Sequence, residues 1–246
     1  MLKNLNCILA QYGNPFSAHL LHMNSRALTV RQSVKYFYNF IFWTPVFFLS
    51  LLLVYNTIPY FSFNPDFIFL EERAVLYEDA VWRACFYVHI FAGMFCITTA
   101  LLQFSSYLLR KRRAIHVWAG KTYVLVVLIL GAPTGLYMSF FAKGGFWERA
   151  LFVFMAVSWF FFTLKGYEMI RKKNVLAHQF WMMRSYAMAL TAVTFRIYHI
   201  LFFYGGVEHL LNYEISLWIS VLGNMLFAEA IIYFKSKAYL KTFSIH

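Results

Sequence analysis

Four side chains that could do chemistry lie in one apolar stretch, which runs from about residue 177 to 204. They are His178, Arg184, Arg196 and His199. Three of them belong to a set that recurs at alternating steps of four and three residues: His178, Met182, Ser185, Ala189, Ala192, Arg196 and His199. On an α-helix such positions form one continuous stripe. The stripe is polar at both ends and small in the middle, so each end is a candidate site.

Two further histidines lie at matching depths in other apolar stretches. His116 lies at the same end of its stretch as His178, and His89 lies about as far from the opposite end as His199. A second stripe of small residues starts at His89 and includes Gly93, Cys96, Ala100 and Gln103. A b-type haem in a helical bundle needs two neutral imidazoles from facing helices, and small residues beside its macrocycle. The pattern therefore predicts haem b as a cofactor, with His89/His199 and His116/His178 as the axial ligands of the iron.

An arginine inside an apolar stretch is costly unless its charge is paired, so Arg184 and Arg196 are candidate binding residues. Glu229 lies at the depth of Arg184, and Lys165 lies one turn from Glu168 near the same level. We therefore expect these four residues to form a structural ion network. No acid within an apolar stretch matches the depth of Arg196, which makes this arginine a candidate contact for an anionic ligand. The loop acids that could still reach it are Asp79, Glu208 and Glu214.

The composition places these residues in a membrane. Of the 246 residues, 61% are hydrophobic and only 13% are charged, too few charges for the surface of a soluble domain. Apolar stretches of about 20 residues, enough to cross roughly 30 Å of hydrocarbon as a helix, recur along the chain. We therefore expect an all-α polytopic membrane bundle, with the lipid bilayer as a partner. The six expected spans are 39–58, 82–108, 115–141, 147–170, 177–204 and 215–235.

The basic residues cluster in one set of loops. The turns 110–113 and 171–173 are wholly basic, whereas the loop 59–81 is rich in acids and holds a single arginine. The positive-inside rule then places both termini in the cytoplasm. We expect a cytoplasmic tail at 1–38 and a transmembrane domain at 39–246. The net charge of +12 follows from this topology, so it does not indicate nucleic-acid binding.

One set of residues carries a family resemblance: Gln103-Phe104, His116, Gly120, Tyr123, Gly135, Gly144-Gly145, Trp159, the block from His178 through Trp181 to Tyr186, and Arg196. In these residues the chain resembles the bacterial membrane-protein family catalogued as domain of unknown function 2306, over about residues 82–204. The resemblance implies a helical bundle in the bacterial inner membrane and no particular activity. The family's arrangement of histidines at helix ends is similar to that of two-haem transmembrane cytochromes b, and this similarity implies electron transfer.

Three functions are compatible with these patterns. The first is a haem-binding membrane protein that passes electrons from a cytoplasmic or quinone donor to an outer acceptor. The second is a non-catalytic subunit of a larger envelope complex, in which the histidines bond loop carbonyls and the small stripes only pack helices together. The third is a transporter of a small anion or a lipid that uses Arg196 as its anion contact. No pairing of a nucleophile with a base supports hydrolytic chemistry.

Overall fold

The computed structural model describes residues 44–103 and 106–243. These residues form helices joined by turns and contain no strand, as expected for an all-α bundle. The expected cytoplasmic tail at 1–38 and Phe104 of the family pattern lie outside the described residues. The described residues from Ser50 onward belong to one compact unit.

Six helices are long and apolar enough to cross a membrane, which confirms the expected number of spans. Their bounds are Thr44–Ser62, Ala80–Gln103, Arg113–Ser139, Phe146–Arg171, Val175–Tyr204 and His209–Leu240. The sixth begins before its expected start at 215. The reason is that the carboxylate of Glu208 accepts hydrogen bonds from the N–H groups of Leu210 and Leu211 and so caps the helix. The orientation of the termini stays a prediction.

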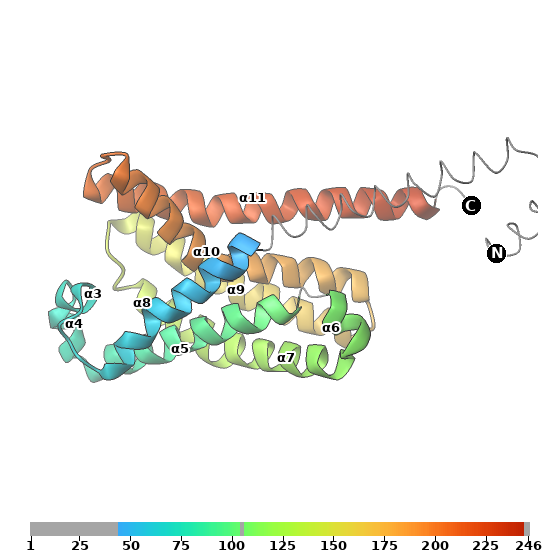
Figure 1. The fold of residues 1–246 in the computed structure, drawn as a ribbon, viewed down its shortest axis with the longest axis horizontal. Helices are drawn as coiled ribbons and strands as arrows, with labels where there is room; N and C mark the ends of the chain where they lie inside the picture. Colours follow the sequence, from blue (N-terminus) through green and yellow to red (C-terminus); the bar gives the residue numbers. More distant parts are fainter. Residues whose placement is uncertain (1–43, 104–105, 244–246) are drawn as a thin grey trace, which may run out of the picture. The chain divides into compact units, whose positions relative to one another are not determined.

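Shorter elements connect and subdivide the spans (Figure 1). The first span ends in the 3₁₀ helix η1 (Ile58–Ser62), and two short helices follow, α3 (Ile68–Glu71) and α4 (Ala74–Glu78). The second span is α5 (Ala80–Gln103), which α6 (Ser106–Lys111) connects to the third. The third consists of α7 (Arg113–Val126), the π-turn η2 (Val127–Gly131) and α8 (Ala132–Ser139). The last three are α9 (Phe146–Arg171), α10 (Val175–Tyr204) and α11 (His209–Phe243).

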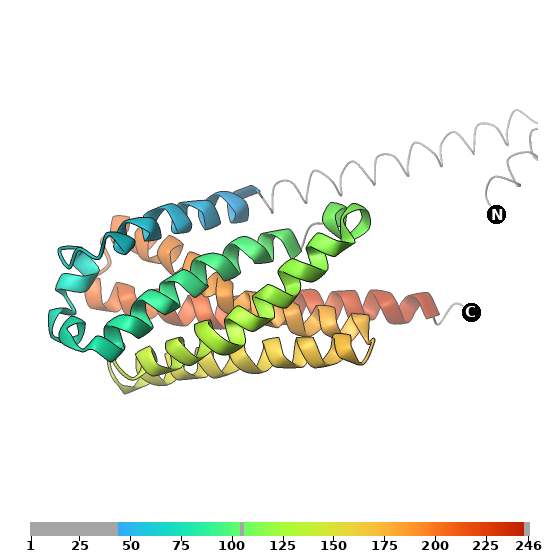
Figure 2. The same cartoon turned by 90° about the horizontal axis from the view of Figure 1, so that it is seen from below.

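Helix α10 is central to the packing of the spans. It packs along α9 and along α11, and α9 packs in turn on α8. Helix α5 packs on α7 and α8, and Figures 1 and 2 both show α5 and α7 side by side. By contrast, α7 and α10 are not closely packed backbone to backbone. We call the end of the bundle with the basic turns 110–113 and 171–173 the inner end, and the opposite end the outer end.

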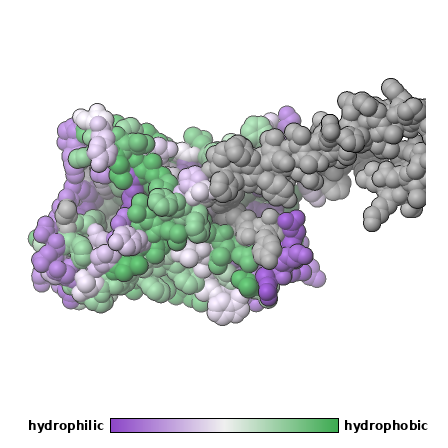
Figure 3. All heavy atoms as spheres, viewed as in Figure 1, coloured by the Kyte–Doolittle hydropathy of each residue, from purple (hydrophilic) through white to green (hydrophobic). Residues whose placement is uncertain are grey.

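The outward faces of the spans are apolar (Figure 3). Large hydrophobic side chains such as Leu226, Phe203 and Phe234 are more than half exposed. In water an apolar surface of this extent would drive association. Such faces are stable in hydrocarbon, so the protein contacts the lipid bilayer along its helices.

Candidate functional site

His178, in the first turn of α10, is oriented by α9. Its Nδ1 lies 2.7 Å from the carbonyl oxygen of Gly166. Because a carbonyl only accepts, Nδ1 carries the hydrogen and Nε2 keeps its lone pair. A Cβ at Gly166 would lie 2.6 Å from the sulfur of Met182, so glycine allows α10 to approach α9 this closely. His178 is therefore held in the tautomer that metal-binding histidines adopt.

His116, in the first turn of α7, lies within electrostatic range of His178. The Nδ1 of His116 is buried and has no hydrogen-bond partner among the described residues. Its carbonyl accepts a hydrogen bond of 2.8 Å from Nε2 of Gln103. A Cβ at Gly120 would lie 3.1 Å from Oε1 of the same glutamine. Gln103 thus ties α5 to α7, and His116 and His178 both lie at the inner end within electrostatic range of each other.

A buried chain of hydroxyl groups lies on the core side of this histidine pair. The hydroxyl of Tyr123 on α7 lies 2.8 Å from Oγ of Ser185 on α10, and it accepts a hydrogen bond of 3.2 Å from Nε1 of Trp159. Ser185 is also 2.7 Å from Oγ1 of Thr163. Three helices are therefore joined through side chains whose polar groups are satisfied. The Tyr123–Ser185 contact bridges α7 and α10 where their backbones stay apart.

His89, on α5, is oriented by the third span. Its Nδ1 lies 3.0 Å from the carbonyl oxygen of Gly131, at the end of the π-turn η2. Pro133 lies two residues further on, and because it has no N–H it cannot continue the helical ladder, which accounts for an irregular turn here. A Cβ at Gly135 would lie 2.8 Å from Cε1 of His89, and one at Gly131 would lie 3.0 Å from the ring of Trp159. Both glycines are therefore needed for these rings, and His89 also keeps its lone pair on Nε2.

His199, in the outer half of α10, faces α11. Its ring stacks on Phe195 with centroids 5.6 Å apart and meets the edge of His209 at 6.0 Å. Its carbonyl accepts a hydrogen bond of 3.0 Å from Nδ2 of Asn212, whereas its Nδ1 is buried without a hydrogen-bond partner in the described chain. His199 and His89 thus lie against different neighbours, α11 and α8. The structure does not join these two rings, and their pairing stays a prediction.

His209 is a candidate residue that the sequence analysis missed. The expected start of the sixth span at 215 leaves His209 in a loop, whereas the cap at Glu208 places it in the first turn of α11. An acid directly before an apolar run is a helix-start signal that could have revealed this position. Nowhere in residues 44–103 and 106–243 do three or more His, Cys, Asp or Glu side chains form a cluster that could hold a metal ion.

The expected partners of Arg184 and Lys165 are confirmed. Nε of Arg184 lies 2.5 Å from Oε1 of Glu229, and the second guanidinium contact to Oε2 is 2.8 Å, a bidentate pair. The guanidinium also lies 4.7 Å from the ring centroid of Trp181. Nζ of Lys165 lies 2.8 Å from Oε2 of Glu168. The expected four-residue network is therefore two separate pairs, because the carboxylate of Glu229 is satisfied by one guanidinium.

Arg196, in the outer half of α10, has no ion pair with any described residue. Its guanidinium donates a hydrogen bond of 2.6 Å to the carbonyl of Ala192, one turn earlier, and Tyr60 of η1 lies within electrostatic range. Two of the loop acids expected to reach it cap helices instead. Asp79 accepts from backbone N–H groups at the start of α5, and Glu208 does the same at the start of α11. Most N–H donors of Arg196 are therefore left for a ligand.

Other cations at the outer end have partners of their own. Nζ of Lys143 lies 2.8 Å from Oε2 of Glu72, and this hydrogen bond lowers the pKa of that carboxyl. Arg73 donates a hydrogen bond of 2.5 Å to the carbonyl of Phe141. Figure 3 shows hydrophilic residues gathered at this end, which lies on the left of the view. Lys143 and Arg73 are therefore engaged by protein groups, whereas Arg196 forms no ion pair within the described residues.

Comparison with known proteins gives one match. The model of a family described as "Predicted membrane protein (DUF2306)" matches residues 86–232. The match extends past the expected core at 82–204 and into α11, so it includes Glu229, the partner of Arg184. No curated protein and no solved structure matches the chain.

Proposed function

The chain belongs to the DUF2306 family of predicted membrane proteins, and we propose that it binds haem b between α7 and α10 and carries electrons through the membrane. The axial ligands would be His116 and His178. When bound, the haem would supply one-electron chemistry. The electron donor would be a cytoplasmic protein or a quinone, the acceptor would lie on the outer side, and the membrane would be the bacterial inner membrane.

The state of the two inner imidazoles carries this proposal. Nδ1 of His178 is bonded to the carbonyl of Gly166, which leaves Nε2 as the ligating atom. The neighbouring His116 has a buried Nδ1 without a hydrogen-bond partner in the described chain. A buried polar atom left unsatisfied costs about 1–3 kcal/mol, a cost that a bound group can offset. An oriented ring beside an unsatisfied one is the arrangement that a shared ligand would complete.

The surroundings of the pair also fit the group. Helices α7 and α10 face each other across the Tyr123–Ser185 hydrogen bond without close backbone packing. Arg113 lies within electrostatic range of His116. A cation at this position suits the carboxylates of haem, which need a positive partner at the membrane edge. The hydroxyl chain below would exclude water from the core side of the site.

The proposal rests on the inner pair. His89 has the same bonded Nδ1 as His178, but its expected partner His199 lies against α11 and beside His209. A second haem at the outer end is supported by the tautomer of His89 alone. Reduced-minus-oxidised spectra of the wild-type protein would separate the two cases, because two haems give twice the absorbance per polypeptide of one.

The test is the visible spectrum of protein purified from haem-replete cells. We expect a Soret band that shifts on reduction with dithionite, and we expect His178→Ala and His116→Ala each to abolish it. His209→Ala is the matched control, since it removes a histidine outside the inner site. A folded wild-type protein without a Soret band would overturn the proposal, and so would full haem content in both inner variants.

A second candidate function is the binding of a small anion at the outer end, as in a transporter. The observation that favours it is Arg196, a cation within a span that bonds a carbonyl of its own helix and forms no ion pair in the described chain. Such a residue marks a functional site by default, because its burial in hydrocarbon is costly. The candidate ligands are carboxylates and phosphates, which accept hydrogen bonds from a guanidinium in pairs.

Anion binding is tested by the melting temperature of the detergent-solubilised protein in a panel of carboxylates and phosphates. We expect at least one anion to raise the melting temperature of the wild type and of Arg196→Lys, but not of Arg196→Ala. If every anion stabilises Arg196→Ala as much as the wild type, Arg196 is not the anion contact.

A further inference from the structure

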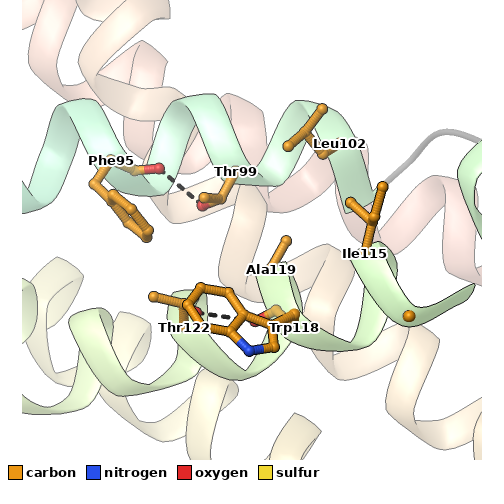
Figure 4. Close-up of a pocket in the computed structure, with 8 residues that line it drawn as sticks. Phe95, Thr99, Leu102, Ile115, Trp118, Ala119 and Thr122 are labelled. Carbon is orange, nitrogen blue, oxygen red and sulfur yellow. Dashed lines mark hydrogen bonds between the residues drawn. The ribbon is translucent and has the colours of Figure 1, made fainter. Parts of the chain in front are cut away.

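An apolar groove of about 480 Å³ lies between α5 and α7, near the inner end. Figure 4 shows the side chains of both helices lining it, with Trp118 along one wall. The only hydroxyl groups in the lining are turned to their own helices: Thr99 donates to the carbonyl of Phe95 and Thr122 to that of Trp118, at 2.8 and 2.9 Å. The groove therefore offers hydrocarbon surface and no unbonded hydroxyl. Its size is within the range of small-ligand sites, roughly 300–1,000 Å³.

The mouth of the groove is basic. Ala114 and Ile115 line the groove, and Lys111, Arg112 and Arg113 come directly before them in the chain. Lys111 and Arg112 are exposed, and neither forms an ion pair in the part of the chain that the structure describes. Helix α7 starts at Arg113, so the positive end of its dipole points to the same place. A negative group is therefore favoured at this mouth.

We propose that this groove holds one acyl chain of an anionic phospholipid whose phosphate binds Lys111 and Arg112. The two halves of such a lipid match the two parts of the site, hydrocarbon along α5 and α7 and a negative charge at the start of α7. Basic pockets between spans bind anionic headgroups in this way. A quinone fits less well, because both lining hydroxyls are already used and the indole N–H of Trp118 is the one side-chain donor left in the lining for its two carbonyl oxygens.

The lipid site is separate from the proposed haem site. The groove is lined by the face of α7 that carries Ile115, Trp118 and Thr122, whereas Tyr123 of the same helix bonds Ser185 toward α10. Lipid binding therefore does not depend on the proposed function. Haem content and lipid content can be measured in one preparation, so failure of either proposal is seen independently.

The first experiment fills the groove. The side chain of Ala119 is almost buried in the lining, and Ala119→Leu would occupy the space of the acyl chain. Ala230→Leu is the matched control, because Ala230 is exposed on α11 and outside the groove. Native mass spectrometry with added phosphatidylglycerol measures the bound lipid. We expect one retained lipid in the wild type and in Ala230→Leu, and at least tenfold weaker binding in Ala119→Leu. Equal binding in the two leucine variants would overturn the proposal.

The second experiment tests the headgroup. Lys111→Gln combined with Arg112→Gln should weaken phosphatidylglycerol binding about tenfold or more, since each cation near the surface attracts anionic lipid. Arg171→Gln combined with Lys172→Gln removes two cations from the other basic turn and should leave binding unchanged. The wild type should bind phosphatidylcholine no more tightly than the variant with both Lys111→Gln and Arg112→Gln binds phosphatidylglycerol. Equal affinity for the two lipids, or a quinone in place of a phospholipid in the organic extract, would contradict the assignment.

Discussion

The two arginines of α10, Arg184 and Arg196, lie about 18 Å apart along the helix axis and have opposite surroundings. Arg184 forms a bidentate pair with Glu229 and lies against the ring of Trp181. Arg196 bonds a carbonyl of its own helix, and the loop acids Asp79 and Glu208 cap other helices. One charge is compensated by the fold and the other is not.

The same contrast extends to the polar groups around each arginine. In the inner half, Tyr123, Trp159 and Ser185 satisfy one another through hydrogen bonds. In the outer half, His199 keeps a buried ring nitrogen without a partner among the described residues. The inner half therefore holds the bundle together, although Nδ1 of His116 has no hydrogen-bond partner among the described residues. The outer half is built around groups that a ligand could complete. This difference predicts opposite results for similar mutations at the two ends.

The largest expected effect is the loss of the acid that compensates Arg184. Glu229→Gln leaves an unpaired guanidinium within a span, and we expect the free energy of unfolding to fall by about 2–3 kcal/mol. Unfolding in mixed micelles at increasing mole fractions of dodecyl sulfate measures this change. Glu168→Gln is the control, because it breaks a pair of residues three apart on one helix and should cost less than about 1 kcal/mol. Equal losses of unfolding free energy in both variants would show that the Arg184–Glu229 pair stabilises the fold no more than the Lys165–Glu168 pair does.

The hydroxyl chain should give the next largest effect. Tyr123→Phe removes the acceptor of the Trp159 indole and the partner of Ser185, both in a buried site. We expect a loss of about 1–2 kcal/mol, the cost of leaving buried donors unsatisfied, in the same unfolding assay. Tyr233→Phe on the exposed face of α11 should change stability by less than about 0.5 kcal/mol. If Tyr123→Phe leaves the free energy of unfolding unchanged, the hydroxyl chain does not hold α7 and α10 together.

For removal of the Arg196 charge we expect little change or a gain in the free energy of unfolding, in contrast to the loss expected for Glu229→Gln. Arg196→Met keeps much of the side-chain volume and removes a charge that the described fold does not compensate. The free energy of unfolding of the ligand-free protein should stay within about 1 kcal/mol of the wild type or rise, because no acid loses its partner. A loss as large as that of Glu229→Gln would show that Arg196 is also a structural residue, and the contrast between the two halves would fail.

The sequence predicted the features that depend on composition and depth. Six apolar stretches specified six spans, and equal depths along their spans identified Arg184 and Glu229 as partners. It did not predict which carbonyls orient His89 and His178, because these contacts depend on the rotation of each helix and on the π-turn before Pro133. His209 was missed for a related reason, since a single capping carboxylate moved the start of α11. Long apolar patterns are averaged over many residues, whereas a site depends on individual contacts.

The smallest expected effect concerns the capping acid Glu208. Hydrogen bonds from the N–H groups of Leu210 and Leu211 lower the pKa of its carboxyl. A carboxyl with a lowered pKa in the folded state stabilises the fold above its unfolded pKa of about 4.3, and this contribution is lost as the pH falls through the folded value. Melting temperatures should therefore decline below about pH 4.3 less steeply in Glu208→Gln than in the wild type.

The capping role of Glu208 also tests whether Arg196 lacks an acidic partner. If Glu208 caps α11 and does not pair with Arg196, then Glu208→Gln and Arg196→Met should have additive effects on the melting temperature and on the free energy of unfolding. Glu214→Gln, which removes an acid of α11 that caps no helix, is the control for the loss of a negative charge at this end. A coupling energy above about 0.5 kcal/mol between Glu208 and Arg196 would reveal an ion pair. In that case the outer arginine is compensated like the inner one, and the case for an anionic ligand at Arg196 is lost.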